Sequence, residues 1–402
     1  MATATSGIDA SLVAHLPSES ALIALSAGGA VADDAMRSLL DRPLDWNGVL
    51  GLAARERAMA PLAHRLQSLR PTTVPLEAVA RIQRLAMVSE FQLMSLHERL
   101  GAILDLFDRN GIESLLLKGA GLAYSAYGRP TERPMGDIDL LVRPEHAQRA
   151  WELALTAGWV RRKDVAQERS YEDHQHLSPL EDADGLQMGL ELHTALFTHQ
   201  APFQLPASAI WERARRVAIG ARTALVPSAE DQLLHASLHF GWSHEMTFGT
   251  WRTLADVERL TAHPVDWDAF VEHARSARGA TCCYWTLRLA REISGAQVPD
   301  AVLAELQPRL PDRVRTRLAR SFAIQALPLP SAPAGSVSLS RAIWTLAIRP
   351  GQQGHGRSRP WLDTEEWVRE GGSMRASKGS PVQRFLQQGF GILRLIAHLS
   401  GS

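Results

Sequence analysis

Two aspartates separated by one residue, Asp137 and Asp139, stand in the apolar stretch DIDLLV and could do chemistry together. Side chains two positions apart on a β-strand point to the same face, so both carboxylates would project together while Ile138 points into the core. Adjacent carboxylates repel each other and lose hydration unless a cation lies between them. Mg²⁺ prefers such oxygen ligands and also binds substrate phosphates. The pair therefore predicts a Mg²⁺ (or Mn²⁺) site.

A third acid follows on a later predicted strand, LQMGLELH, where Glu191 and His193 share one face and the leucines share the other. If this strand lies beside DIDLLV, Glu191 reaches the same cluster. Three acids can hold two metal ions, one activating an attacking hydroxyl and one neutralising a triphosphate. His193 would contact substrate, cap the cluster or serve as a hydrogen-bonded structural residue.

A glycine-rich turn, KGAG, follows an apolar strand and opens the next helix. Backbone N–H groups at a helix start can hold phosphate oxygens, and glycines let phosphate approach closely. Lys118 and Arg133 would add positive charge, although Arg133 could instead pair locally with Glu132 or Asp137. The spacing is not that of a Walker loop. The predicted phosphate-binding residues are Lys118, Gly119, Ala120, Gly121 and Arg133.

The order of these features resembles the nucleotidyltransferase superfamily of DNA polymerase β type. More narrowly, LLLKGAGLAYSAYGRPTERPMGDIDLLV resembles the bacterial family of uncharacterised nucleotidyltransferases. Its members carry a leucine-rich strand, Lys-Gly, and an Arg-Pro-x-x-Asp-x-Asp-Leu-Leu-Val block. The later LELH and LLHASLHFGW…TWRTLADVERL are similar to downstream blocks of that family, so the resemblance spans roughly residues 45 to 260.

This resemblance implies metal-dependent transfer of a nucleoside monophosphate from an NTP to an acceptor, with release of pyrophosphate. It implies that Asp137 and Asp139 bind the metals and that Glu191 orients or deprotonates the acceptor. Two departures from the superfamily pattern stand out. The turn reads Gly119-Ala120 where Gly-Ser or Gly-Gly is common, which removes a hydroxyl contact to phosphate, and the third acid is Glu where Asp is frequent.

The overall charge balance bears on the acceptor. Lys plus Arg and Asp plus Glu number 43 each in 402 residues, which argues against a long nucleic acid and favours a small molecule, a peptide or a protein. The adjacent Cys282 and Cys283 have neither disulfide nor metal spacing and indicate two buried thiols. The N-terminus lacks a signal-peptide pattern and no apolar run reaches membrane-spanning length, so we expect a cytoplasmic protein.

Helical and strand patterns alternate along the chain. Helical periodicity, including one helix from Leu76 to Asn110, fills residues 1–110. An α/β core follows over 111–205, with strands at 112–117 and 137–142 and a hairpin turning at Asp184-Gly185. Helices return over 206–326, and 327–402 form a Pro/Gly-rich linker and tail, with a short amphipathic helix near 385–399. The predicted class is α+β (mixed α/β), with a small mixed sheet flanked by helical regions.

The C-terminal helices would cover the cleft and supply base and acceptor contacts. Trp251 and Arg252 could stack on a purine ring, or pack in an ordinary core. The loop at 351–360, GQQGHGRSRP, could hold an anionic acceptor or be simply solvated.

Two other functions stay open. One is a catalytically degenerate module that binds nucleotide without transfer, against which the intact acids argue. The other is a helical metal phosphohydrolase centred on His235, His239 and Asp256, since histidines four apart share a helix face. That segment has no H-E-x-x-H glutamate and its neighbours are apolar, which favours core histidines.

Overall fold

The structure of the protein, a computed structural model, describes residues 8–162, 174–183, 188–328, 343–345 and 347–348. Several sequence predictions lie outside these residues. They are the hairpin turn at Asp184-Gly185, nearly all of the linker and tail at 327–402, the loop at 351–360 and the helix near 385–399.

One mixed sheet carries the α/β part of the chain, in the strand order β3-β4-β5-β2-β1-β7-β6. Strand β2 runs antiparallel to β1 and parallel to β5, so the predicted mixture of strand directions is confirmed. The strands are β1 (Ser114–Leu116), β2 (Asp137–Val142), β3 (Trp159–Arg161), β4 (Leu180–Asp182), β5 (Gly189–His193), β6 (Arg215–Ile219) and β7 (Arg222–Val226).

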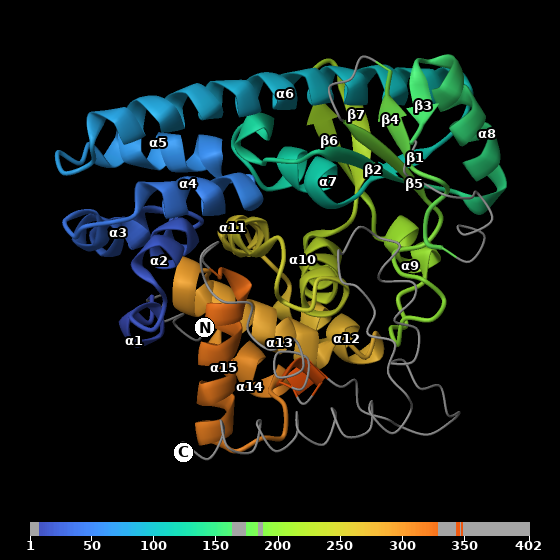
Figure 1. Ribbon diagram of the computed structural model, residues 1–402. Coiled ribbons are helices and arrows are strands. Elements are labelled where there is room, and N and C mark those ends of the chain that lie inside the picture. The colour runs from blue at the N-terminus through green and yellow to red at the C-terminus, as the bar shows by residue number, and fades with distance from the viewer. Residues whose placement is uncertain (1–7, 163–173, 184–187, 329–342, 346, 349–402) are drawn as a thin grey trace, which may run out of the picture.

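Helices surround this sheet and build the rest of the described chain, which makes the class α+β as predicted (Figure 1). The α-helices are α1 (Ala10–Val13), α2 (Ser18–Leu25), α3 (Asp33–Leu40), α4 (Trp46–Arg55), α5 (Met59–Leu69), α6 (Leu76–Arg109), α7 (Lys118–Ser125), α8 (Pro144–Thr156), α9 (Ala207–Glu212), α10 (Ala229–Leu238), α11 (Thr250–Thr261), α12 (Trp267–Ser276), α13 (Ala280–Leu289), α14 (Asp300–Leu306) and α15 (Asp312–Ala326). Shorter turns are η1 (Ala30–Ala32), η2 (Pro130–Glu132), η4 (His239–Ser243) and η5 (Ala290–Ser294). None of the described helices is both long and apolar enough to cross a bilayer.

The long helix α6 joins the two halves of the molecule (Figure 1). Its 34 residues span about 50 Å at 1.5 Å per residue. Ile82 and Ala86, in its first half, belong to the helical core, whereas Leu100 and Phe107, in its second half, pack on the sheet. The helix ends at Arg109, before Gly111 with its positive φ of 69°, as the sequence predicts. The sheet is therefore held at a fixed place relative to the helical core.

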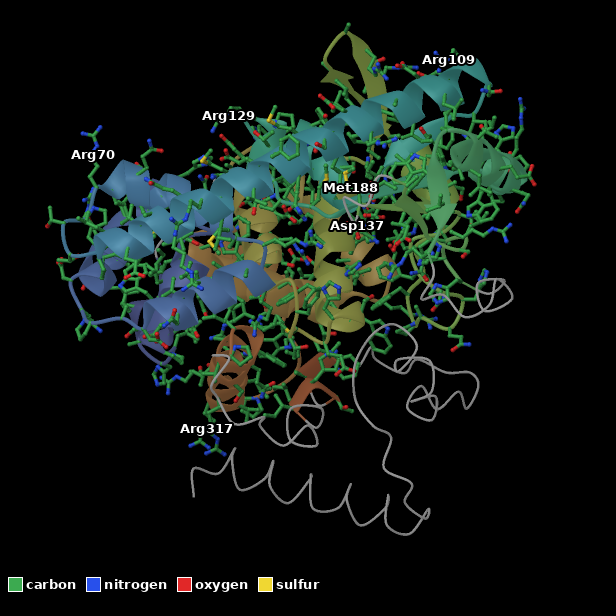
Figure 2. The ribbon with its side chains drawn as sticks, turned by 45° about the horizontal axis from the view of Figure 1, so that its top comes forward. Arg70, Arg109, Arg129, Asp137, Met188 and Arg317 are labelled. Atoms are coloured by element: carbon green, nitrogen blue, oxygen red, sulfur yellow. The ribbon has the colours of Figure 1, made fainter. Side chains whose placement is uncertain are left out.

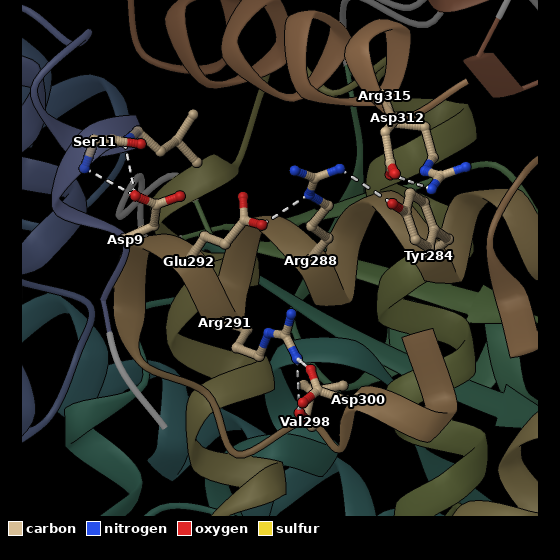
Figure 3. Close-up of polar contacts among 11 residues, drawn as sticks. Asp9, Ser11, Tyr284, Arg288, Arg291, Glu292, Val298, Asp300, Asp312 and Arg315 are labelled. Carbon is tan, nitrogen blue, oxygen red and sulfur yellow. Dashed lines mark hydrogen bonds and ion pairs between the residues drawn. The ribbon is translucent and has the colours of Figure 1, made fainter. Parts of the chain in front are cut away.

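Polar contacts join the start of α1 to η5 in the C-terminal helical region (Figure 3). Asp9 caps α1 by accepting from the Ser11 N–H at 2.8 Å, and its own N–H donates to the Glu292 carbonyl at 2.8 Å. The Glu292 carboxylate in turn accepts from Arg288 Nε at 2.8 Å. The N-terminal and C-terminal helical regions consequently share one apolar core, although they are far apart in the sequence.

The expectation that only helices follow Pro206 is wrong. Strands β6 and β7 form an antiparallel hairpin, and β7 pairs parallel with β1. The turn contains Gly220, whose φ is +60°. Val217 and Ile219 stand two positions apart, which is the strand period, but Ala218 between them is not polar, and the surrounding helical patterns outweigh so short a signal.

Candidate active site

The carboxylates gather on the sheet face opposite α6. Ile138 and Leu140 of β2 pack into the core that contains α6, so Asp137 and Asp139 point to the other face. In the parallel β2–β5 ladder, Asp139 lies opposite Glu191, so the two strands lie side by side and Glu191 reaches the cluster, as the sequence expected for that arrangement. Figure 2 labels Asp137 near the middle of the molecule.

Gly189 leaves space for the Asp137 side chain. Gly189 is the residue opposite Asp137 in the ladder, and a Cβ added there would lie 3.2 Å from the Asp137 Cβ. That distance is tighter than an ordinary contact, so a larger residue would push the Asp137 side chain aside. On the face of the cluster, β5 therefore carries a glycine, an acid and a histidine in turn, at 189, 191 and 193.

Lys118 and His193 hold the inner carboxylates. Lys118 Nζ lies 2.7 Å from Asp139 Oδ1 and 3.6 Å from Glu191 Oε2. His193 Nε2 donates to Asp139 Oδ1 at 2.9 Å and lies 3.4 Å from Glu191 Oε2. The cation that two adjacent carboxylates require is thus supplied in part by the chain itself.

These contacts separate the three acids by pKa. Burial would raise the pKa of Asp139 and of Glu191, but the Lys118 charge and the His193 hydrogen bond outweigh it and hold both pKa values below their usual range. Asp137 sits at the rim, with an exposed side chain. Crowding by surrounding protein, then the charges of Asp139 and Glu191, raise its pKa.

The two cationic partners respond in the same way. Burial alone would lower the pKa of Lys118 and of His193. The nearby carboxylates raise the pKa of Lys118, and hydrogen bonds to Asp139 and Glu191 raise that of His193.

The same residues fit a divalent cation. One ligand atom from each of Asp139, Glu191 and His193 lies within 4.8 Å of the others, and within the described residues this is the one such group of three. Carboxylate oxygens suit Mg²⁺ and Mn²⁺, and an imidazole nitrogen suits transition metals better than Mg²⁺. The sequence left His193 as a substrate contact, a cap of the cluster or a hydrogen-bonded structural residue, and it lies in the cluster hydrogen-bonded to Asp139.

The KGAG segment follows β1 and opens a helix, as predicted, and forms the first turn of α7. Its glycines have packing reasons. A Cβ at Gly121 would lie 2.6 Å from the Leu116 carbonyl oxygen, and one at Gly119 would lie 3.0 Å from the Met135 Cβ. Lys118, expected at phosphate, faces the carboxylates. Phosphate binding by Gly119, Ala120 and the helix start stays a prediction.

Arg133 is paired across the molecule. Its Nε donates to Asp256 Oδ1 at 2.6 Å and its Nη2 to Asp256 Oδ2 at 2.8 Å, and the pair is buried. Tyr127 also donates to Asp256 Oδ1, at 2.7 Å. The local pairing with Glu132 or Asp137 that the sequence allowed is therefore wrong, and the guanidinium is committed to α11.

Trp251 occupies the second of the two environments that the sequence left open, an ordinary core. Its side chain is 2 % exposed, its Nε1 donates to Ser26 Oγ at 2.9 Å, and it packs in the helical core. It is not retained as a base contact. Arg252, the next residue, lies within electrostatic range of Asp137 and 5.4 Å from the Phe248 ring. Sequence reasoning missed Arg57, whose guanidinium lies against Gly136, because no local pattern links residue 57 to residue 136.

The rival histidine site does not assemble. His235 and His239 lie on α10 and η4 with ring centroids 6.0 Å apart, but Asp256 is taken by Arg133 and Tyr127. Burial, then the charge of Lys118, lowers the pKa of His235 to about 3. Both histidines are therefore neutral near pH 7, and we assign them a structural role beside the cluster.

His235 makes stability depend on pH. Its pKa is about 3 in the fold, against about 6.5 in an unfolded chain, so the unfolded state gains a proton first as pH falls below about 6.5. We expect the free energy of unfolding to drop by about 2 kcal/mol more between pH 7 and pH 5 in the natural chain than in His235→Leu. Urea unfolding at both pH values measures this. Equal drops in the two proteins would contradict it.

Comparison with known proteins gives one match. The family described as uncharacterised nucleotidyltransferase matches residues 42–295, which is more than half of the 402 residues. The match extends beyond the part of the chain that carries the sequence resemblance. No curated protein and no solved structure matches the chain.

Proposed function

The chain belongs to the family of uncharacterised nucleotidyltransferases, and on that premise we propose that it transfers a nucleoside monophosphate from an NTP to an acceptor hydroxyl or similar group, releasing pyrophosphate. The acceptor class we favour is a small molecule, a peptide or a protein, because the chain has no net charge to attract a long nucleic acid.

The observation that supports this most is the β2–β5 register. It sets Asp139 opposite Glu191 with His193 beside them, and Asp137 at the rim. Asp137, Asp139 and Glu191, with His193, would hold Mg²⁺ or Mn²⁺. A bound ion would supply positive charge to the triphosphate and to the attacking oxygen.

The chain's own groups would position the reactants. Glu191 stays ionised because Lys118 and His193 hold its pKa well below the usual range, so its carboxylate can accept a hydrogen bond from the acceptor hydroxyl and orient it. Lys118 keeps positive charge beside the inner acids and can follow negative charge that develops on the phosphate. The first N–H groups of α7, at Gly119 and Ala120, would bind phosphate oxygens.

Calorimetric titration of ATP, GTP, CTP and UTP with Mg²⁺ tests the proposal. We expect one nucleotide to bind only when Mg²⁺ is present, and Asp137→Asn to remove that binding without unfolding the protein. Glu181→Gln, on β4 of the same sheet, serves as the matched control and should bind like the natural chain. Folded protein that binds no NTP would overturn the proposal.

A second candidate is a module that binds nucleotide without transferring it. The Lys118 contact with Asp139 and Glu191 favours it, because the ammonium already neutralises two of the acids. Pyrophosphate release from the bound NTP separates the two functions. If NTP binds but no pyrophosphate is released with any acceptor, only the nucleotide-binding module remains as the function.

A further inference from the structure

Arg57 has an unusual backbone conformation. Helix α4 ends at Arg55, and Arg57 follows with φ of +57°, in the left-handed region where glycine is the usual residue. A side chain is disfavoured there, and such positions cluster at sites where the surrounding structure has a reason to keep them. Keeping arginine at this position suggests that its side chain has a function.

The guanidinium of Arg57 lies against Gly136, the residue before Asp137. A Cβ added to Gly136 would lie 2.3 Å from Arg57 Nη1, 2.4 Å from Nη2 and 2.5 Å from Cζ. With any larger residue at 136, the Arg57 guanidinium would have to move from this position. The two uncommon features, a left-handed arginine and a glycine ahead of Asp137, thus explain one another.

A buried hydrogen bond brings a second arginine to the same place. Glu56 is fully buried, and its Oε2 accepts from the Trp251 N–H in the first turn of α11 at 3.1 Å. The residues that follow these two partners are Arg57 and Arg252. The bond joins the end of α4 to the start of α11, and Arg252 lies within electrostatic range of both Arg57 and Asp137.

Neither guanidinium is neutralised by the chain. Among the described residues, neither Arg57 nor Arg252 makes an ion pair or a side-chain hydrogen bond, and Arg252 only stacks on Phe248 at 5.4 Å. The third arginine nearby, Arg133, is paired with Asp256. Burial and then the Arg133 charge lower the pKa of Arg252, and together they outweigh the opposite effect of the Asp137 charge.

Two unpaired guanidiniums beside a carboxylate cluster are suited to an anion with several charges. A single carboxylate satisfies one guanidinium, whereas a polyphosphate offers oxygens to both at once. We propose that Arg57 and Arg252 form a clamp for the β- and γ-phosphates of the NTP and for the leaving pyrophosphate, an inference that rests on the proposed function. The clamp would place the leaving group beside Asp137, with one arginine from each helical region.

Inorganic tripolyphosphate, titrated into the full chain with Mg²⁺, probes the clamp without a nucleoside. We expect Arg57→Gly to bind it at least tenfold more weakly and yet to unfold at a higher temperature, since glycine suits the left-handed position. Arg252→Gln should weaken binding similarly. Arg70 is the matched control, because it is an exposed arginine at a helix end with φ of +48° and lies at the edge of the molecule, far from Asp137 (Figure 2).

The outcomes separate the clamp from the proposed function. Arg70→Gly should also gain thermal stability but keep its affinity for tripolyphosphate. If Arg57→Gly binds both tripolyphosphate and the preferred NTP as tightly as the natural chain, the clamp is wrong and the nucleotidyl-transfer proposal is untouched. If the natural chain binds no NTP, the proposed function fails, and the tripolyphosphate titration still decides whether the two arginines bind polyphosphate.

Discussion

Asp139→Asn is expected to lose Mg²⁺-dependent NTP binding and fold stability together, whereas Asp137→Asn is expected to lose only the binding. Asp139 is 1 % exposed and carries the charge that holds Lys118 and His193. Removing one partner of a buried charge pair costs about 3–5 kcal/mol, because the other charge stays buried without compensation. Removing a ligand should weaken metal-dependent binding about a hundredfold or more, since even outer contacts are worth 10–100-fold.

The pKa of Asp137 is shifted in the opposite direction to that of Asp139. Its pKa is raised by crowding and by the charges of Asp139 and Glu191, so its ionised form is less favourable in the fold than in the unfolded chain. An asparagine at 137 relieves that repulsion at neutral pH. The pKa of Asp139 is lowered instead, so its contribution to stability is present above the unfolded pKa and is lost as pH falls through the folded one.

Urea unfolding and calorimetry on the same preparations measure both effects. Glu181→Gln controls for loss of an acid from the sheet and should change neither quantity. A loss of stability in Asp137→Asn equal to that in Asp139→Asn would contradict the different environments assigned to the two acids. Unchanged NTP affinity in both variants would show that neither aspartate belongs to the NTP site.

The sequence predicted the parts of the fold that depend on neighbours along the chain. The strand at 137–142 has the predicted bounds, and the long helix ends one residue before its predicted end. The pairing of Glu191 with Asp139 was predictable because strand alternation fixes which residues share a face, and the β2–β5 ladder then aligns the acids. Site residues on two neighbouring strands can thus be predicted from the local sequence pattern.

The remaining features depend on contacts between distant residues. Arg133 finds Asp256 at a separation of 123 positions, and Glu56 finds the Trp251 N–H at a separation of 195. Nothing in the residues around position 57 marks a left-handed arginine, because its conformation follows from where α4 ends against the rest of the fold. For the same reason, the sequence could not choose between a base contact and core packing for Trp251, whose indole donates to Ser26 at the end of α2. Tertiary packing decides such cases, and local pattern carries no signal for it.

Breaking the buried Arg133–Asp256 ion pair is expected to change the stability of the fold strongly. Asp256→Asn or Arg133→Met alone should destabilise the fold by about 3–5 kcal/mol, because each leaves an uncompensated buried charge or a broken fork of hydrogen bonds. Replacing both, as Arg133→Met/Asp256→Leu, should restore most of the loss, since apolar groups of similar volume can replace a buried ion pair. The double-mutant cycle is best measured in a Tyr127→Phe background, so that no hydroxyl is left without its acceptor.

The same cycle decides whether Arg133 binds substrate or only positions α11. The structure commits its Nε and Nη2 to Asp256 and its Nη1 to the Pro134 carbonyl, so we expect a positioning role. On that reading the double variant regains NTP affinity together with stability, to within about threefold, because Arg252 returns to its place once α11 is held again. If stability returns and NTP affinity stays more than tenfold weak, Arg133 contacts phosphate directly, as the sequence alone predicts. The arginine clamp would then have a third member, opened from Asp256 when the NTP binds.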